Sequence, residues 1–516
     1  MIQLHYTGHP LFDVGLAAIV AFVEKENPAD LTYADLTKVA DYIETYYTEQ
    51  PLSSFLTVSL MNSDFTQPAF KDNPERRRAY AQRVARSFDP SIPKGEEQCV
   101  FTGQPAMGIS LSLKRDKEGK DELPPGMAYR QHIPLITGES IINFAPWGDP
   151  GLPVSGEALL CLQFFPMGCR KCNGRLLAVH SDNLEIILDM AREALHENLK
   201  AISLAKALGE TKLRDTPQTA QTLLIDTLLE MDDRRLQEHK ATRPFSITAY
   251  HLTNSGQSSP LDEKSPPLRI YHLPLQIVQF LLMVNSPDYR PAWKKVVARG
   301  WEASKPRKNA LENKSGRDND SSPSEYRRNF VYEDIFRLPE NVRSFVRMYL
   351  LRIPKRNSAQ LDPRRDYSPR REFDLVSWKL TELFLLEVMH MDKERIEEIR
   401  DLGDTLAAYV KEQNDKGFFR NFYTVRRYGD FRTLLMRANY KYVKAGHAPL
   451  LTFDSYLTVF EEGEDLPRTD WSLARDLVLI RMIEQLYTNW PTWFGEHADA
   501  LPDEKELNTT LSENEQ

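Results

Sequence analysis

The chain has 516 residues, of which 41% are hydrophobic and 27% are charged, so it is long enough for roughly two to four packed domains. Four cysteines argue against a disulfide framework and favour a reducing cytoplasm. The formal net charge of −8 argues against a freely acting nucleic-acid-binding protein, although basic residues gather in a few segments. We expect no membrane span and no secretion signal, because the apolar run at residues 16–23 is short and follows no basic segment.

The N-terminal segment predicts a turn at Gly8 followed by a buried helix. Asp13 is the expected N-cap, and apolar residues then recur at helical spacing between Leu16 and Val23. Gly8 and Gly15 fit neither a P-loop nor a dinucleotide-binding fingerprint. We therefore interpret them as parts of a turn that starts a buried helix.

A polar loop and an arginine-rich helix come next. The loop at residues 62–68 contains amide and hydroxyl side chains, and the helix after it begins near Arg76, Arg77 and Arg78. Such a run of like charges is usually a solvated face, and its functional alternative is a ridge that contacts phosphates. The sequence alone leaves both interpretations open.

The stretch around Cys169 and Cys172 is the most informative part of the chain. Two cysteines separated by two residues can hold one metal ion, and the Asn173-Gly174 pair after them readily takes the positive φ angles of a hairpin turn. A short strand at residues 175–180 continues the hairpin, which is typical of a zinc knuckle. The alternative is a thioredoxin-like redox pair, which would sit at the start of a helix.

A structural zinc site needs four ligands, and the second half of this one is incomplete. Cys99 begins a similar turn, but Thr102 stands where a second cysteine would be. If no metal binds, the two hairpins are held by packing alone. The expected zinc ligands are Cys99, Cys169 and Cys172, with a fourth from Cys161, His132 or His180.

An amphipathic helix and a second hairpin follow the cysteine turns. Ser181 and Asp182 are expected to cap the helix, and Gly209 is expected to end it. Two strands at residues 245–252 and 268–274 flank a loop rich in serine and glycine, and together they predict a hairpin.

The elements together predict an α+β protein with β-hairpins in its N-terminal part and an α-helical bundle at its C-terminus. Segments with few apolar residues predict a flexible linker and a disordered acidic tail. The expected order is a mixed α+β domain at 1–301 with a knuckle-like insert at 90–180, the linker at 302–325, a connecting helical region at 326–388 with a basic loop at 352–372, the bundle at 389–495, and the tail at 496–516.

Three apolar stripes at helical spacing predict the core of the bundle. They lie at residues 396–406, 431–442 and 473–483. Basic residues on and before the second helix are expected on its outer face. These residues are Arg426, Arg427, Arg432, Arg437, Lys441 and Lys444.

No catalytic motif is recognisable in the sequence. It contains no HExxH, GxSxG, P-loop or kinase motif, and its histidines and carboxylates form no close acid–base pair along the chain. We therefore expect that the protein is not an enzyme.

Several segments, spread over nearly the whole chain, form an ordered pattern. They are Tyr6-Thr7-Gly8 with Asp13-Val14-Gly15, residues 62–68, residues 99–103, residues 164–166 with 169–172, residues 250–257 with Leu273-Pro274, and the helical region after Met391. This pattern resembles the large subunit of the type I-B CRISPR Cascade complex, in the branch with two Cys-x-x-Cys motifs. Thr102 departs from the family pattern, because it replaces a cysteine.

The resemblance implies a non-enzymatic role in an RNA-guided antiviral complex of the cytoplasm. Such subunits read the short motif beside the target (the PAM), help to open double-stranded target DNA, hold the displaced single strand and recruit a helicase–nuclease. The target itself is read by pairing with the guide RNA. The implied partners are the guide-RNA complex, the target DNA and its displaced strand, the backbone, guide-end and small subunits of Cascade, and the helicase–nuclease.

The family does not assign the contact residues here, so we choose them by their chemistry. Short amide and hydroxyl side chains on loops suit base edges, and arginine and lysine suit phosphates. The candidates for PAM reading are Asn62, Thr66, Gln67, Gln104 and Asn254. The candidates for phosphate contact are Arg76, Arg77, Arg78, Arg364, Arg365, Arg370, Arg371, Arg426, Arg427, Arg432, Arg437 and Lys441.

Met391 lies where the predicted bundle begins, and some type I-B systems make their small subunit by internal translation of this gene. The resemblance implies such a product here, and the alternative is that Met389 and Met391 are ordinary packing residues.

Two other functions stay open for the whole chain. One is a zinc-containing scaffold or regulatory protein without nucleic acid, and the other is a thiol oxidoreductase that uses Cys169 and Cys172.

Overall fold

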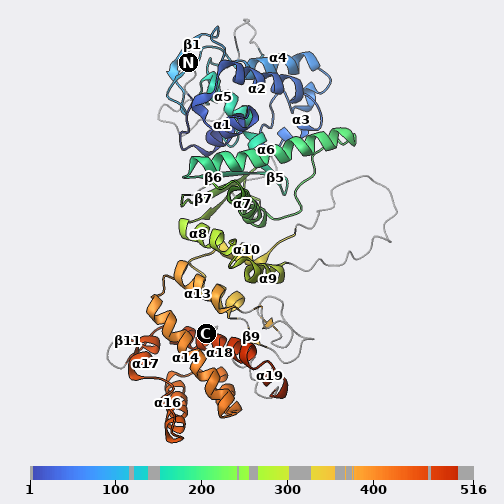
Figure 1. The fold of residues 1–516 in the computed structure, drawn as a ribbon. Helices are drawn as coiled ribbons and strands as arrows, with labels where there is room; N and C mark the ends of the chain where they lie inside the picture. The colour runs from blue at the N-terminus through green and yellow to red at the C-terminus, as the bar shows by residue number, and fades with distance from the viewer. Residues whose placement is uncertain are drawn as a thin grey trace. The chain divides into compact units, whose positions relative to one another are not determined.

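The computed structural model describes residues 4–114, 121, 123–136, 151–240, 243–254, 265–301, 327–351, 353–354, 366–367, 375, 377–462 and 466–497. These residues form two compact units (Figure 1). The first unit runs to Leu275 and includes Arg327, and the second begins at Gln276 and continues from Arg328. The second unit thus starts before the predicted linker, which lies outside the described residues, as does the predicted tail from residue 498 on.

Helix α1 (Pro10–Phe22) is the centre of the first unit. Every residue from Leu11 to Val20 is buried, which is the pattern of a helix surrounded by other elements. Its main neighbours are α5 (Gly156–Phe164) and α6 (Leu184–Ala207). Gly15 permits the close approach to α5, because a Cβ atom at this position would lie 2.0 Å from the carbonyl oxygen of Cys161. Gly15 is therefore a packing position inside the helix, whereas the sequence predicted a turn that starts the helix.

The start of α1 differs from the prediction. The helix begins at Pro10, so Asp13 lies within the first turns and is not the N-cap. Proline fits the first helical position, because its missing N–H would have no partner there. The buried Asp13 carboxylate instead accepts hydrogen bonds from the backbone N–H groups of Thr7 (2.8 Å) and Gly8 (2.9 Å), and it contacts His180 Nε2 at 3.0 Å.

A four-stranded antiparallel sheet accompanies α1 and α6 in the first unit. Its strands follow the order β5 (Arg170–Cys172), β6 (Arg175–Ser181), β7 (Ile247–Leu252) and β8 (Leu268–Leu273). Asn173 and Gly174 have φ angles of 51° and 67°, which is the pair of positive values that a type I′ hairpin turn requires. Both predicted hairpins, β5–β6 and β7–β8, are thus confirmed.

Helix α6 ends before Gly209 as predicted, but a different residue caps its start. Asn183 is the N-cap, and its side chain accepts a backbone hydrogen bond from the first turn. Ser181 Oγ donates to the Ser246 carbonyl oxygen, and Asp182 Oδ1 accepts from the Ser246 N–H, both at 2.7 Å. Ser181 and Asp182 therefore fasten the start of α6 to the segment that leads into β7.

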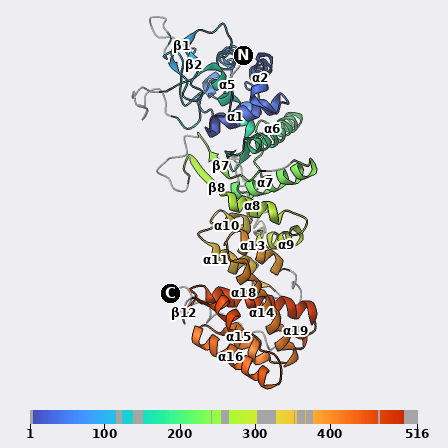
Figure 2. The ribbon, with the colours of Figure 1, turned by 60° about the vertical axis from the view of Figure 1, so that its left-hand side comes forward.

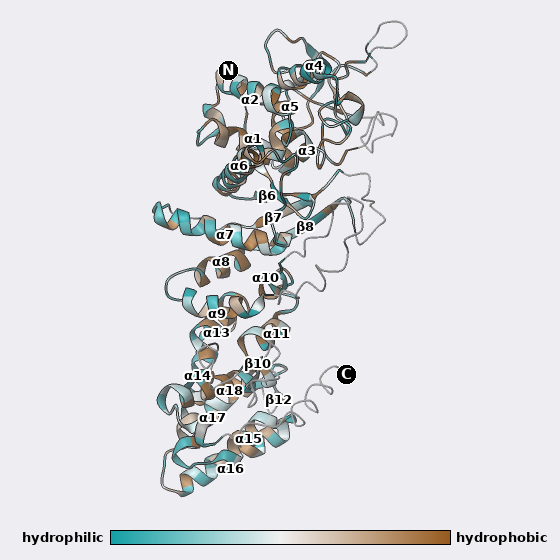
Figure 3. Cartoon of the chain, turned by 90° about the vertical axis from the view of Figure 1, so that its right-hand side faces the viewer, coloured by the Kyte–Doolittle hydropathy of each residue, from teal (hydrophilic) through white to brown (hydrophobic). Residues whose placement is uncertain are grey.

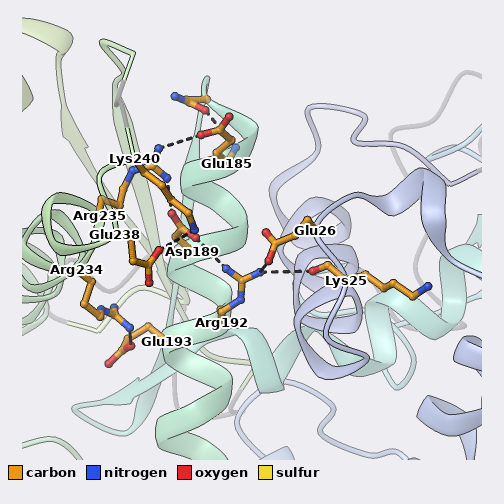
Figure 4. Close-up of polar contacts among 11 residues, drawn as sticks. Lys25, Glu26, Glu185, Asp189, Arg192, Glu193, Arg234, Arg235, Glu238 and Lys240 are labelled. Carbon is orange, nitrogen blue, oxygen red and sulfur yellow. Dashed lines mark hydrogen bonds and ion pairs between the residues drawn. The ribbon is translucent and has the colours of Figure 1, made fainter.

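Ion pairs hold α7 (Ala220–Gln237) and the loop after α1 against α6 (Figure 4). The buried Arg235 of α7 binds Asp189 at 2.5 Å and Glu185 at 2.9 Å, and both acids belong to α6. Arg192 of α6 binds Glu26 at 3.0 Å. The charged residues in this part of the first unit therefore serve its internal packing.

The other described elements of the first unit are short. Within the predicted insert at 90–180, β1 pairs with β2 and β3 pairs with β4, both antiparallel, whereas helix α5 was not predicted. The elements are η1 (Pro28–Asp30), α2 (Tyr33–Tyr46), α3 (Leu52–Leu56), η2 (Pro68–Phe70), α4 (Pro74–Ala85), β1 (Lys94–Gln98), β2 (Pro105–Met107), β3 (Met127–Ala128), β4 (Leu152–Pro153) and η3 (Phe165–Gly168).

The second unit is built around two long helices. Figures 1 and 2 show α14 (Lys393–Glu412) and α18 (Trp471–Asn489) side by side, and this is the most extensive helix contact in the described chain. The apolar stripes predicted at 396–406 and 473–483 are their buried faces. Gly403 permits close packing, because a Cβ atom there would lie 2.6 Å from the Arg481 Cβ.

The remaining elements of the second unit are mostly helical, so the α+β class with a helical C-terminal part is confirmed. Hydrophobic residues cover most of α8, whereas α16 is mixed in character (Figure 3). The elements are α8 (Leu275–Val284), α9 (Arg290–Gly300), α10 (Phe330–Ile335), α11 (Val342–Phe345), η4 (Val346–Leu350), β9 (Ile353–Pro354), β10 (Asp366–Tyr367), α13 (Trp378–Glu387), α15 (Lys416–Thr424), α16 (Tyr428–Lys444), α17 (Phe453–Phe460), β11 (Glu461–Glu462), β12 (Leu466–Pro467) and α19 (Trp493–Glu496).

Candidate nucleic-acid interface

Helix α16 and the connection that leads into it carry five of the predicted phosphate-binding residues. The inner face of the helix is apolar, and Phe431 and Leu435 are fully buried on it. The Phe431 ring packs against Phe422, Phe460 and Trp471, with centroid distances of 5.5, 4.8 and 5.6 Å. Aromatic packing from three neighbouring elements therefore fixes which side of α16 faces outward.

Hydrogen bonds fix the beginning of α16. The Tyr428 hydroxyl contacts the hydroxyl of Tyr456 and the carboxylate of Glu461, both at 2.7 Å. Burial and these two hydrogen bonds raise the pKa of Tyr428 far above its usual value, so the phenol stays protonated. The helix start is thereby joined to α17 and β11.

The end of α16 is held in a similar way. Lys441 Nζ lies 2.9 Å from Asp415 Oδ2, and the Tyr442 hydroxyl donates to Glu412 at 2.7 Å. Burial alone would raise the pKa of Asp415, but the hydrogen bonds from Lys441 and from the Phe418 N–H keep it below its usual value. Lys441 is thus partly neutralised within the unit, in contrast to Arg432 and Arg437, which form no ion pair with another described residue.

The outer face of α16 combines cations with large apolar side chains. Arg432, Arg437 and Lys444 are exposed, and none of them forms an ion pair with another described residue. Met436 is 58% exposed and Tyr440 is 70% exposed. Such a surface offers phosphate-binding groups and a stacking platform on one rigid helix.

The charge of this region is opposite to that of the whole chain. Residues 426–444 contain six basic residues and one acidic residue, Asp430, whereas the chain as a whole carries a formal charge of −8. Arg426 and Arg427 are exposed in the connection that leads into α16. Five predicted phosphate contacts therefore lie together. They are Arg426, Arg427, Arg432, Arg437 and Lys441.

The predicted arginine ridge of α4 is arranged differently. Arg76 binds Asp64 at 2.8 Å and lies over the Phe70 ring at 3.8 Å, and Arg77 donates to the Thr48 carbonyl oxygen at 3.3 Å. Arg78 is exposed. Two of the three arginines thus have partners inside the first unit. The candidates Arg364, Arg365, Arg370 and Arg371 lie outside the described residues.

Three candidates for PAM reading lie in one turn before α4. Asn62 is exposed and has a φ angle of 69°, which asparagine tolerates better than most residues. The Thr66 hydroxyl donates to the Leu60 carbonyl oxygen at 3.0 Å, and Gln67 is half-buried. Gln104 is exposed, and its carbonyl oxygen accepts from the Cys99 N–H in the β1–β2 turn. Asn62 and Gln104 are therefore the most accessible of the five candidates.

Asn254, the fifth candidate, is buried, and its side chain connects the segments around Ser59 and Arg130. Its Nδ2 donates to the Ser59 carbonyl oxygen at 3.0 Å and to the Arg130 carbonyl oxygen at 3.2 Å. Its Oδ1 accepts from Arg130 Nε at 3.2 Å. Both N–H groups of the amide are used and the side chain is buried, so Asn254 is not placed to contact a base edge.

The Cys-x-x-Cys thiols are buried and bound to backbone carbonyls. Cys169 Sγ donates to the Phe165 carbonyl oxygen and Cys172 Sγ donates to the Gln218 carbonyl oxygen, both at 3.2 Å. Burial raises the pKa of Cys169 well above its usual value and that of Cys172 to about 12. Burial thus disfavours the thiolate form at both positions, and disulfide exchange requires an accessible thiolate.

The predicted zinc ligands do not come together in this arrangement. Among the described residues, which include all four cysteines, no three His, Cys, Asp or Glu side chains are grouped as metal ligands. Of the possible fourth ligands, His132 Nδ1 accepts from the Tyr129 N–H, His180 contacts Asp13, and burial raises the pKa of Cys161. The predicted zinc ligands are thus not grouped in the described part of the chain, where the β5–β6 hairpin is held by packing and hydrogen bonds.

Sequence reasoning missed the apolar side chains on the outer face of α16. Met436, Tyr440 and Val443 recur at three- and four-residue spacing, on the side opposite the buried stripe. This second periodicity can be recognised in the sequence, and it predicts a helix with two apolar faces. The contact between Asp13 and His180 was not readable, since 167 positions separate the two residues.

Comparison of the chain with family models, curated proteins and solved structures gave no match. None of the described helices combines the length and the apolar character that a membrane span requires.

Proposed function

We propose that this protein is the large subunit of a type I-B Cascade complex, which reads the PAM, helps to open target DNA, holds the displaced strand and recruits the helicase–nuclease in the cytoplasm. The observation that carries the proposal is the outer face of α16, where cations without an ion-pair partner in the described part of the chain flank exposed apolar residues. The ordered segments that resemble this family provide the second support.

The surface chemistry supports a nucleic-acid role over the two alternatives. The function of a scaffold that binds no nucleic acid would not explain why six basic residues cluster at 426–444 in an acidic protein. A thiol oxidoreductase needs an accessible thiolate, whereas Cys169 and Cys172 are buried and have raised pKa values.

The proposal includes a small subunit that starts near Met391. Met391 directly precedes Asp392, the N-cap of α14, whose side chain accepts from the Arg395 N–H at 3.2 Å. A product that starts there would keep α14 to α18 whole and would lose α13. Mass spectrometry of the purified complex would detect this product. Its absence, with unchanged assembly when Met389 and Met391 are leucine, would remove this part of the proposal.

Co-purification tests the main proposal. The tagged chain should bring down a guide RNA together with the other Cascade subunits, and the complex should bind target DNA according to its PAM. Asn62→Ala combined with Gln104→Ala should weaken that discrimination by about 1–3 kcal/mol for each lost base contact. Asn254→Ala should instead reduce stability. A chain that purifies without guide RNA and without other subunits would contradict the proposal.

A further inference from the structure

The outer face of α16 carries an apolar stripe with cations on both sides. At about 100° of rotation per residue, Met436, Tyr440 and Val443 fall within about 60° of one another. They are 58%, 70% and 45% exposed. Arg432 lies on one side of this stripe, and Arg437 and Lys444 lie on the other. From Arg432 to Lys444 the stripe is about 18 Å long, at a rise of about 1.5 Å per residue.

The stripe is not part of the hydrophobic core. The buried residues Phe431, Leu435 and Ala438 lie on the opposite side of the helix, so α16 has two apolar faces. Large apolar side chains that are exposed next to one another mark an interaction site, because exposing them to water is unfavourable. Methionine and tyrosine are both suited to contact with flat rings, through a polarizable sulfur and through a π face.

The charges around the stripe select the kind of partner. Arg432, Arg437 and Lys444 have no ion-pair partner among the described residues, and Asp430 is the only acidic residue between 426 and 444. A ligand that fits must offer negative charge along two lines and flat apolar groups between them. Single-stranded nucleic acid has this chemistry, because its phosphates and its unpaired bases are both accessible.

We propose that Tyr440, with Met436 beside it, is a base-stacking platform for single-stranded DNA, whose phosphates are held by Arg432, Arg437 and Lys444. This inference rests on the proposed function, in which the strand is the displaced DNA strand. It deepens that function, because it assigns base contacts as well as phosphate contacts to α16. Paired bases in a duplex cannot stack in this way, so the platform distinguishes single strands from double strands.

Fluorescence anisotropy with labelled oligo(dT) and the purified full-length chain tests the inference. Tyr440→Leu removes the π face and keeps an apolar side chain, so we expect about tenfold weaker binding with an unchanged salt dependence. Tyr440→Phe keeps the ring and should bind like the wild type. Tyr33→Leu, at a 42% exposed tyrosine of α2, is the matched control and should have no effect.

Several results would overturn the inference. They are absence of oligo(dT) binding by the wild-type chain at low salt, wild-type binding by Tyr440→Leu, and an equal loss of binding to duplex DNA of the same length. Normal oligo(dT) binding by Tyr440→Leu together with loss of other Cascade subunits would assign the stripe to a protein partner. Failure of the wild-type chain to co-purify with guide RNA would instead contradict the proposed function and leave the tyrosine result standing.

Discussion

Helices α4 and α16 both carry runs of basic residues, but they use them in different ways. In α4, Arg76 is bound to Asp64 and covers Phe70. In α16, Arg432 and Arg437 point away from the packed face and have no ion-pair partner among the described residues. A run of arginines is therefore ambiguous until its neighbours are known. An acid or an aromatic ring within reach gives the arginine a structural role, whereas exposed cations beside exposed apolar groups form the surface that we propose binds nucleic acid.

The largest expected change in stability comes from an arginine that is buried and paired inside the second unit. Arg395 is 7% exposed, and its two terminal nitrogens bind Asp470 at 2.8 and 2.9 Å. Arg395→Met should lower the free energy of unfolding by about 3 kcal/mol, because Asp470 would lose its two hydrogen bonds from Arg395 and keep only the more distant Arg468, at 3.9 Å. Arg432→Met is the matched control and should leave stability within about 0.5 kcal/mol. Urea unfolding measures both, and equal stabilities for the two variants would contradict the distinction.

The second prediction concerns a buried neutral group of the first unit. Burial lowers the pKa of His132 to about 3, whereas an unfolded histidine titrates near 6.5. Between these values the unfolded state binds the extra proton, so stability should fall by about 1 kcal/mol for each pH unit as the pH drops below about 6.5. His132→Asn should remove this contribution, and His272→Asn, at an exposed histidine, should not. Identical pH dependence in the wild type and His132→Asn would refute the assignment.

The smallest loss of stability is expected from substitutions in α4. Arg76→Ala should cost about 1 kcal/mol, because it removes a partly buried ion pair and the contact with Phe70. Arg78→Ala should not change the unfolding midpoint measurably, since Arg78 is exposed. If both substitutions had the same effect, the internal role of Arg76 would be wrong.

Local patterns predicted the fold where one segment contains the whole signal. The Asn173-Gly174 turn and the stop at Gly209 follow from the φ preferences of asparagine and glycine. The β7–β8 hairpin follows from two strand-like segments that flank a polar stretch of the sequence. The buried stripes of α14 and α18 follow from helical periodicity. The cap of α6 was misassigned by one or two positions, because Ser181, Asp182 and Asn183 can all accept a backbone hydrogen bond.

Contacts between segments that are distant in the chain could not be predicted from the sequence. Cys169 and Cys172 are buried, and their thiols donate to the carbonyl oxygens of Phe165 and Gln218. These contacts depend on how the chain folds around the β5 strand, which the local sequence does not show. Asn254 appeared accessible in a polar loop, but Ser59 and Arg130 occupy its hydrogen-bonding groups. For α16 the charges were predicted on the correct face, and the apolar stripe between them was overlooked.

The salt dependence of single-stranded DNA binding tests the role of α16 most directly. The full-length chain is compared with Arg432→Gln/Arg437→Gln/Lys444→Gln, and Arg76→Gln/Arg77→Gln/Arg78→Gln is the control triple variant. Each phosphate contact contributes about 0.7 to the slope of log affinity against log salt, so the α16 variant should lose a slope of about 2 and the α4 control at most about 0.7. An unchanged slope for the α16 variant would contradict a nucleic-acid interface on this helix.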